Sequence, residues 1–307
     1  TLLFDISETE TSMNINFEYY KIFYYVAKYG NLTKAAHVLG NSQPNITRAM
    51  NCLESEIRCT LFIRTNRGVR LTPEGERLYT RVSAAMAQLQ LAEEELTDST
   101  GLEHGSISIG ASETALSIYL LERLKHFHMT YPNIRLKIYN HSTPQAVHSV
   151  KNGEIDFAIV TTPTTAKPPL KEIRLESFRE VLVGGKTFTA LSSQTLTLAE
   201  LKNYPLICLG RETMTFAFYH QLFLSHGLEL EPDTEAATTD QILPLVKSDL
   251  GLAFIPESMA IPAIQNHEVI PIHLQETIPC RYVCMVSDIK RPLSSAARKL
   301  KDLILHS

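Results

Sequence analysis

The chain has 307 residues, of which 44% are hydrophobic and 20% charged, and its formal net charge is −4 at pH 7. This length and balance suit two or three globular domains with substantial cores and exclude a largely disordered chain. No apolar run reaches the roughly 18 residues of a membrane span, and the acidic start lacks the features of a signal peptide, which favours a soluble cytoplasmic protein. Met13 reads well as a start, so we expect the fold to begin there.

Positive charge is concentrated near the beginning of the chain. Residues 16–72 hold eight Lys or Arg against three acidic residues, whereas residues 73–105 hold two against seven. A basic domain on an acidic chain is the electrostatic footprint of a protein that meets phosphate at one end only. An ordinary solvated surface has the same composition, so charge alone leaves the function open.

Two short helical patterns flank the turn at Leu39-Gly40-Asn41. In the first pattern Thr33 is expected to cap the helix, and Gly40 permits the left-handed turn that follows. The second pattern places apolar residues at helical spacing and predicts one buried stripe, made of Ile46, Met50, Leu53 and Ile57.

The opposite face of the second pattern is polar. It carries Gln43, Pro44, Thr47, Arg48 and Asn51. Arg suits guanine, Asn and Gln suit adenine, and Thr or Pro suits the thymine methyl group. We therefore interpret the two patterns as a helix-turn-helix, with a generic helical hairpin as the alternative.

Residues 61–72 predict a two-stranded hairpin with its turn at Asn66-Arg67-Gly68. Three of its side chains are cationic: Arg64, Arg67 and Arg70. Such a basic wing can bind backbone phosphates on either side of a groove while the helix lies inside it.

Thr72-Pro73-Glu74 has the residue types that open a helix. The apolar positions that follow alternate in spacing between four and three, a seven-residue repeat that predicts a two-helix seam. They are Leu78, Val82, Ala85, Leu89, Ala92 and Leu96. The alternative is a helix that lies on its own domain's core. A two-fold dimer would present two recognition helices to a palindromic site.

Beyond the polar linker at 99–105, strands and helices alternate, which predicts parallel βαβ units. Residues 146–160 and 241–255 echo each other as helix, tight turn and buried strand. We expect two similar α/β lobes, lobe I of residues 106–162 and 283–307 and lobe II of residues 163–282.

In order and spacing, residues 17–96 resemble the N-terminal segment of LysR-type transcriptional regulators. The matching stretches are FYYVAKYGNLTKAAHVLGNSQPNITRAMNCLE, LFIRTNRGVRLTPEGE and the heptad helix. One departure is Arg58, where the family usually has the Gly that closes the recognition helix; Arg58 could add a phosphate contact. The resemblance implies DNA contacts from Thr33, Lys34, Ser42, Gln43, Pro44, Asn45, Thr47 and Arg48, with Arg64, Arg67 and Arg70 on the wing.

The resemblance also implies the architecture of the whole chain. The expected fold class is α/β, with an N-terminal all-α winged helix-turn-helix (13–72), a dimerisation helix (73–98), a hinge linker (99–105) and a two-lobed effector domain (106–307) similar to periplasmic binding proteins. The implied partners are double-stranded DNA with a palindromic operator, a small-molecule effector and further copies of the chain as a dimer or tetramer. No cofactor and no membrane partner are expected.

On parallel sheets, ligands bind beyond the carboxyl ends of the strands, where helices begin. This rule predicts an effector site formed by Ser112, Glu113, Thr161, Thr162, Arg211, Thr213 and Met214. Amides at helix N-termini favour an anion, so a carboxylate metabolite is the predicted effector class. Glu113 argues against a carboxylate effector, since its own carboxylate would repel one or select a cation.

Two other classes of function were weighed. An enzyme is disfavoured because the chain has no GxSxG elbow, GxGxxG, P-loop or metal-ligand spacing. A ligand-independent DNA-binding protein, with lobes that serve only oligomerisation, remains the alternative and would have a cleft filled by side chains. The five cysteines suit packing in a reduced compartment, with redox sensing by Cys208 or by Cys280 and Cys284 as a minor alternative.

Overall fold

The computed structural model describes residues 15–65, 68–97 and 105–306. The chain divides into two compact units, residues 1–90 and 91–307. Arg67, most of the predicted linker and the side chain of Leu96 lie outside the described residues. Among the helices that are described, none is long and apolar enough to cross a membrane.

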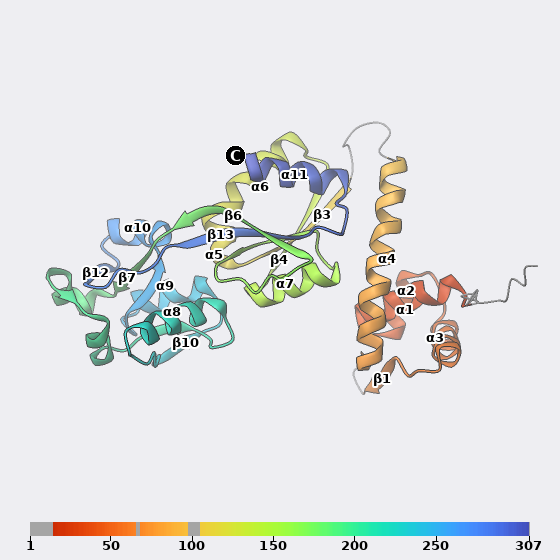
Figure 1. Cartoon of the computed structure of the whole chain (residues 1–307), viewed down its shortest axis with the longest axis horizontal. Coiled ribbons are helices and arrows are strands. Elements are labelled where there is room, and N and C mark those ends of the chain that lie inside the picture. The colour runs from red at the N-terminus through yellow and green to blue at the C-terminus, as the bar shows by residue number, and fades with distance from the viewer. Residues whose placement is uncertain (1–14, 66–67, 98–104, 307) are drawn as a thin grey trace, which may run out of the picture. The chain divides into compact units, whose positions relative to one another are not determined.

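The first unit is built from three short helices, a hairpin and the start of a long helix (Figure 1). Its elements are α1 (Phe17–Tyr29), α2 (Leu32–Val38), α3 (Gln43–Ile57), β1 (Phe62–Thr65), β2 (Gly68–Leu71) and α4 (Pro73–Thr97). The predicted stripe of α3 faces the core, with Ile46 and Leu53 fully buried against Phe23 of α1 and Ala35 of α2. The small side chain of Ala35 allows α2 and α3 to approach each other closely.

The turn between α2 and α3 uses the left-handed conformation predicted for Gly40, whose φ is 60°. Ser42 caps α3 by accepting the amide hydrogen of Asn45. The predicted cap at Thr33 is wrong. Helix α2 begins two residues earlier than that cap implies, at Leu32, so Asn31 is its N-cap and accepts the amide of Lys34 at 3.0 Å.

Arg58 ends α3 in the left-handed conformation, with φ 56° and ψ 40°. Its amide still closes the helix on Glu54 and Ser55. The turn into the wing is therefore kept without glycine, at the steric cost that a Cβ brings to this backbone region.

Replacing Arg58 by glycine is expected to raise the free energy of unfolding of the first unit by about 0.5–1 kcal/mol. Relief of left-handed strain contributes about 1–2 kcal/mol, and the greater freedom of glycine in the unfolded chain offsets part of it. Urea titration followed by circular dichroism measures the change. Arg58→Ala keeps the Cβ and should bring no gain; an equal gain there would assign the effect to charge.

The hairpin is anchored to the helices at two points. Glu54 of α3 accepts the amides of Leu61 and Phe62 at 2.6 and 3.0 Å. The Val69 amide donates to the carbonyl of Gly30 at 2.9 Å, and a Cβ at Gly68 would lie only 2.2 Å from that same oxygen. These contacts hold the hairpin beside α3.

The second unit contains two lobes. Lobe I has a five-stranded sheet with β3 parallel to β4 and β5, and β13 antiparallel to β5 and β6. Its strands in spatial order are β4 (Ile134–Asn140), β3 (Gly105–Ala111), β5 (Phe157–Thr161), β13 (Arg281–Asp288) and β6 (Leu170–Phe178).

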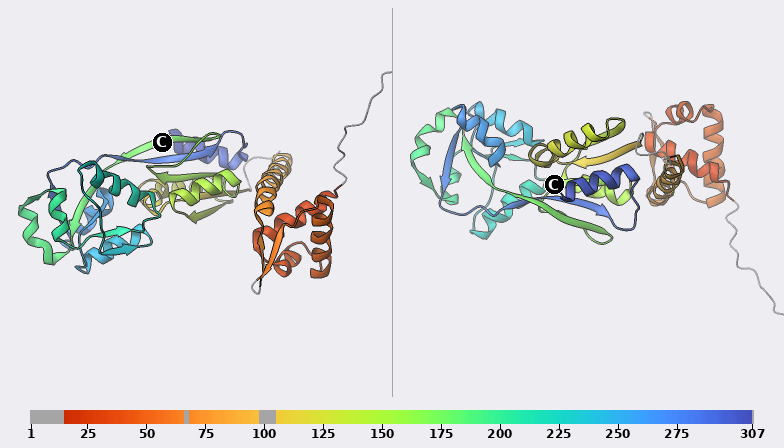
Figure 2. Two further views of the ribbon diagram at one scale, coloured as in Figure 1. Left: turned by 60° about the horizontal axis from the view of Figure 1, so that its bottom comes forward. Right: turned by 90° about the horizontal axis from the view of Figure 1, so that it is seen from above.

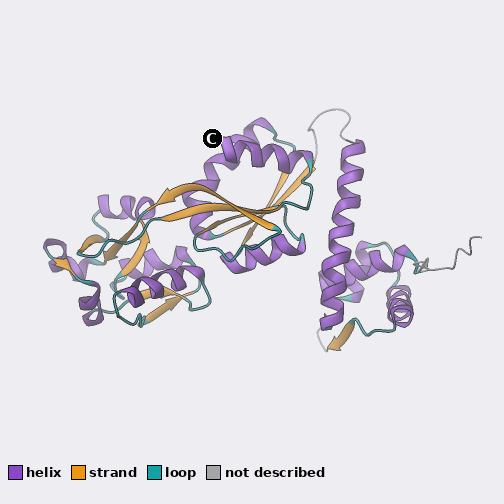
Figure 3. Cartoon of the chain, viewed as in Figure 1, coloured by secondary structure: helices purple, strands orange, loops and turns teal. Residues whose placement is uncertain are grey.

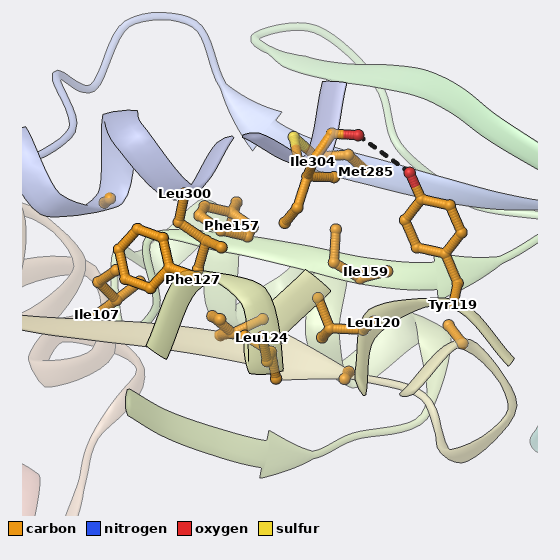
Figure 4. Close-up of a cluster of buried hydrophobic side chains, with 14 of the residues drawn as sticks. Ile107, Tyr119, Leu120, Leu124, Phe127, Phe157, Ile159, Met285, Leu300 and Ile304 are labelled. Carbon is orange, nitrogen blue, oxygen red and sulfur yellow. Dashed lines mark hydrogen bonds between the residues drawn. The ribbon is translucent and has the colours of Figure 1, made fainter. Parts of the chain in front are cut away.

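Helices cover both faces of this sheet (Figure 3). On one face lie α5 (Glu113–Ala115), a π-helical turn (Leu116–Leu120), α6 (Leu121–Thr130) and α11 (Ser295–His306); on the other lies α7 (Thr143–Asn152). In the core of the first face, Phe127 and Leu300 pack on Phe157, and the Tyr119 hydroxyl donates to the carbonyl of Ile304 at 3.0 Å (Figure 4).

Lobe II contains a four-stranded sheet in the order β11-β7-β12-β8 and the parallel pair β9 and β10. Its elements are β7 (Glu180–Gly184), β8 (Thr195–Leu196), β9 (Ile207–Leu209), α8 (Met214–Ser225), β10 (Thr234–Ala236), α9 (Thr239–Lys247), β11 (Ala253–Pro256), α10 (Glu257–Gln265) and β12 (Ile270–Leu274), with 3-10 segments at Lys186–Ser193 and Leu198–Asn203. The predicted echo is confirmed, since α7 and β5 match α9 and β11 in order.

One predicted boundary is wrong. Lobe II was expected to begin at residue 163, but β6 pairs with β13 along its whole length and belongs to the sheet of lobe I. The two long strands run side by side to the point where the chain crosses between lobes (Figure 2). The crossings therefore fall at Arg179, between β6 and β7, and between β12 and β13. Sequence periodicity does not show which sheet an extended crossover strand joins.

Candidate functional sites

The predicted recognition face of α3 is exposed. Five of its side chains are open to solvent, and Thr47 is half-buried; the exposed five are Gln43, Pro44, Asn45, Arg48 and Asn51. Thr33 and Lys34 of α2 and Ser42 are exposed beside them. The Thr33 hydroxyl donates to Oε1 of Gln43 at 3.3 Å, so the starts of α2 and α3 form one polar edge.

The wing continues this edge. Arg64 and Arg70 are exposed on the hairpin, where Arg70 pairs in register with Ile63. Thr47, Asn51 and Arg64 border the same hollow of about 40 Å³ between α3 and β1. The structure thus brings the predicted base-reading and phosphate-binding side chains to one surface, with a guanidinium beside hydroxyl and amide groups.

The predicted seam of α4 divides into two parts. Val82 is buried with Met86 in the core of the first unit, and Leu78 packs partly against that core, as the alternative reading of this helix expects. Further along the helix the seam is uncovered, with Ala85, Leu89 and Ala92 exposed. Leu89 is a large apolar side chain that is 44% exposed among the described residues.

A cavity of about 250 Å³ lies between the two lobes. Five of the seven predicted effector residues line it: Ser112, Glu113, Thr161, Thr213 and Met214. A hydrogen bond of 3.2 Å connects the hydroxyl groups of two lining residues, Thr114 of lobe I and Thr239 of lobe II. The walls are therefore set by helix starts from both lobes.

Two predicted effector residues do not line the cavity. Arg211 turns toward Glu235, with Nε 3.3 Å from the carboxylate, and its guanidinium lies over the ring of Phe216. Thr162 directly follows β5, where its carbonyl accepts from Arg281 and its hydroxyl oxygen accepts the amide of Tyr282. Both are held by interactions with residues distant in sequence, which the strand-end rule does not consider.

Other lining residues went unpredicted. Most of them lie at the ends of β4 and β10 or at the start of a helix: Asn140, His141, Ser142, Thr143, Gln145, Thr215, Thr238 and Thr239, together with Thr114, Leu209 and Ala237. Glu212, which belongs to the loop of residues 211–214 that the strand-end rule predicts, lines the cavity as well. The strand-end rule, applied to β4 and β10 as well as to β3, β5 and β9, would have found most of them. The capping box of Ser142 with Gln145 was the available signal.

A buried ion pair lies behind the cavity. Arg281 and Glu180, the first residues of β13 and β7, meet at 2.6 Å with side chains 1% exposed. Arg281 Nη2 also donates to the hydroxyl oxygens of Thr161 and Thr215, at 2.8 and 3.0 Å. Because each member lies at a lobe crossing, the pair ties the two crossovers together. No local pattern in the sequence indicates the pair, since the partners are 101 residues apart.

Two of the three thiols considered for redox sensing are buried. Burial raises the pKa of the Cys208 thiol to about 12, and the nearby Glu235 carboxylate adds to the shift. Burial likewise raises the pKa of Cys284 to about 12, and Cys280 lies exposed before β13. Thiolates are the reactive form, so both buried thiols are expected to be inert.

Two protein-family models together match most of the chain. Residues 17–76 match the model of the bacterial regulatory helix-turn-helix protein, lysR family, and residues 100–307 match that of the LysR substrate binding domain. The chain is 28% identical over 253 residues to the HTH-type transcriptional regulator YofA of Bacillus velezensis, covering 82% of this chain and 84% of that one.

Two solved structures share the fold. Full-length CbnR complexed with its target DNA has a TM-score of 0.65 at 19% identity, over 94% of this chain and 98% of that one. The effector binding domain of QuiR in complex with shikimate has a TM-score of 0.58 at 19% identity, over 66% of this chain and 96% of that one.

Proposed function

The chain belongs to the family of LysR-type transcriptional regulators, and we propose that it reads its operator with the exposed edge of α3 and responds to a small carboxylate in the cleft between its lobes. Members of this family are regulators and not enzymes. The observation that carries the proposal is the open polar edge of α3, flanked by the arginines of the wing. We also propose that it acts in the cytoplasm, where the chromosome of a bacterium lies.

The recognition surface is proposed to consist of α3, the start of α2 and the wing. Within it, Arg48 and Asn51 can pair with base edges in the major groove, while Arg64 and Arg70 bind phosphate. Arg67, at the tip of the hairpin in sequence, completes the proposed wing. CbnR, whose fold the chain shares, is known in complex with its target DNA.

Arg48→Ala is expected to weaken binding to the preferred DNA by about 10- to 100-fold, since a base-reading arginine contributes about 1–3 kcal/mol to discrimination. Genomic fragments selected by the unaltered protein provide the specific DNA, and fluorescence anisotropy compares them with mixed-sequence DNA. The mixed-sequence affinity should change far less.

Two further variants test the assignment of roles. Arg70→Ala should weaken binding to all sequences. It should also reduce the slope of log affinity against log salt concentration by about one, because one phosphate contact is lost. Arg174→Ala removes a guanidinium that is 63% exposed on β6, outside the proposed surface, and should change neither affinity. Unchanged sequence preference in Arg48→Ala would mean that α3 is not the reading element.

The chain is proposed to form dimers through the uncovered part of α4, with tetramers as a further possible assembly. A pair of α3 helices related by two-fold symmetry fits a palindromic operator. Support comes from the exposed Ala85, Leu89 and Ala92, which continue the seven-residue repeat beyond the domain core.

The cleft is proposed as the effector site, in preference to the ligand-independent alternative. That alternative expects a cleft filled by side chains, whereas the cavity of about 250 Å³ has room for a small metabolite. QuiR, whose effector domain shares this fold, is known in complex with shikimate, which is a carboxylate. Effector binding would shift the equilibrium between lobe arrangements, a coupling typically of about 1–3 kcal/mol.

A further inference from the structure

We propose that the effector is an amino carboxylate, a small molecule that carries an ammonium group as well as a carboxylate. This inference rests on the proposed role of the cleft as the effector site and narrows the class of ligand. It follows from two opposed electrostatic features of the cavity wall, one acidic and one that favours anions.

The acidic feature consists of Glu113 from lobe I and Glu212 from lobe II, which both line the cavity. Glu113 accepts hydrogen bonds only from neutral groups, the Ser117 hydroxyl and the Asn140 amide, each at 3.4 Å. Among the described residues neither carboxylate has an ion-pair partner, and no Lys or Arg lines the cavity. A ligand with negative charge alone would be repelled from these two groups.

The anion-favouring feature consists of helix starts. Helices α7, α8 and α9 have 10, 12 and 9 residues, and their N-caps Ser142, Thr213 and Thr238 all line the cavity. The amides of a first helical turn carry partial positive charge. The Thr213 hydroxyl caps α8, but that of Thr238 makes no cap hydrogen bond and leaves the start of α9 open to a ligand.

The buried Arg281 strengthens this feature indirectly. Its Nη2 donates to the hydroxyl oxygens of Thr161 and Thr215, and both threonines line the cavity. A hydroxyl has a single hydrogen, and accepting at its oxygen leaves that hydrogen available to donate elsewhere. The two threonines can therefore offer polarised O–H donors to a ligand carboxylate, while the guanidinium itself stays paired with Glu180.

An unsatisfied polar atom in the cavity wall also indicates a polar ligand. Nδ1 of His141, in the cavity wall, is covered and makes no hydrogen bond within the described chain. A smaller hollow of about 20 Å³ shares Thr114, Thr215 and Thr239 with the cavity. The Tyr219 hydroxyl borders that hollow beside the Glu180 carboxylate, and both side chains are more than nine-tenths buried. A covered polar atom such as Nδ1 of His141 is costly unless water or a ligand meets it.

Both features must be satisfied by one small ligand. A plain amine would leave the helix starts and hydroxyl donors unused, and a plain carboxylate would face Glu113 and Glu212. The cavity volume lies below the roughly 300–1,000 Å³ typical of sites for drug-sized ligands. The lining of hydroxyl and amide side chains suits a molecule of amino-acid size with a polar side group.

The test uses the full chain and isothermal titration calorimetry with the twenty standard L-amino acids. Each amino acid that binds is compared with its 2-hydroxy acid, in which a hydroxyl replaces the ammonium group, and with its decarboxylated amine. We expect at least one amino acid to bind and both analogues to bind at least tenfold more weakly. Shikimate, succinate and 2-oxoglutarate serve as carboxylates without an ammonium group.

Matched variants connect the selectivity to the cavity. Glu113→Gln and Glu212→Gln should each reduce the preference for the amino acid over its 2-hydroxy acid by about tenfold. Glu231→Gln removes an exposed carboxylate outside the cavity and should leave that ratio unchanged. Because the readout is a ratio of two affinities, a general loss of folded protein does not alter it.

The remaining outcomes separate the two proposals. If the plain carboxylates bind and the amino acids do not, the amino-carboxylate class is wrong while the effector role of the cleft stands. If amino acids bind with a selectivity that neither variant alters, the assignment to Glu113 and Glu212 is wrong. If no member of either set binds, both the ligand class and the effector role proposed for the cleft are overturned.

Discussion

Replacing Glu180 by alanine is expected to lower the free energy of unfolding of the unit at residues 91–307 by about 3–5 kcal/mol. The change leaves the Arg281 guanidinium, 1% exposed, without its counter-ion. Its remaining acceptors are the carbonyl of Thr162 and the hydroxyls of Thr161 and Thr215, all neutral. An uncompensated buried charge is among the most destabilising features that a single substitution creates. Urea or thermal unfolding, followed by circular dichroism, measures the loss.

An exposed ion pair in the same lobe provides the control. Arg211 and Glu235 are 66% and 46% exposed, so Glu235→Ala should change stability by less than about 1 kcal/mol. Adding Arg281→Met to Glu180→Ala removes the orphaned charge and should recover part of the stability. A loss in Glu180→Ala no larger than that in Glu235→Ala would show that the pair does not hold the crossovers together.

Leu89→Lys is expected to convert the protein from dimers to monomers at micromolar concentration. A leucine buried in a two-helix seam contributes about 1.5–3 kcal/mol to the free energy of association. Each dimer carries the substitution twice because of its two-fold symmetry. The dimer dissociation constant should therefore rise more than a hundredfold, before any repulsion between the two lysines. Sedimentation velocity across a range of concentrations measures it, and operator affinity should fall in parallel.

Val38→Lys is the matched control for this change. Val38 lies on α2 with 46% exposure, close to the 44% of Leu89, but outside the seven-residue repeat. The control should sediment as the unaltered protein does. A Leu89→Lys protein that remains dimeric would place the subunit interface on another surface and leave the exposed part of α4 unexplained.

The exposed polar edge of α3 was largely predictable because its order is local. The stripe of Ile46, Met50 and Leu53 follows from helical spacing, and once it is buried the opposite face with Arg48 must be exposed. The error at Thr33 was an error of two residues in a helix boundary, where Asn31 competes as a cap. Arg58 shows that a backbone requirement can be met by a residue that does not favour it.

The cleft was only partly predictable. Strand ends placed five lining residues correctly, because a parallel sheet brings the carboxyl ends of its strands to one edge. The same rule placed Arg211 and Thr162 there as well, although Glu235 and Arg281 hold them elsewhere. The strand β6 was assigned to the wrong lobe because its alternation of side chains is the same in either sheet.

By itself the sequence determined the helices of the first unit, the basic polar edge of α3 and the family, since each depends on residues within a few turns of one another. Only the tertiary structure decided which side chains meet across the cleft, that the acidic pair Glu113 and Glu212 shares a cavity with three helix starts, and that Arg281 is sealed behind Thr161 and Thr215. These contacts join segments some one hundred residues apart, so they arise from the packing of two lobes and leave no periodic pattern in the chain.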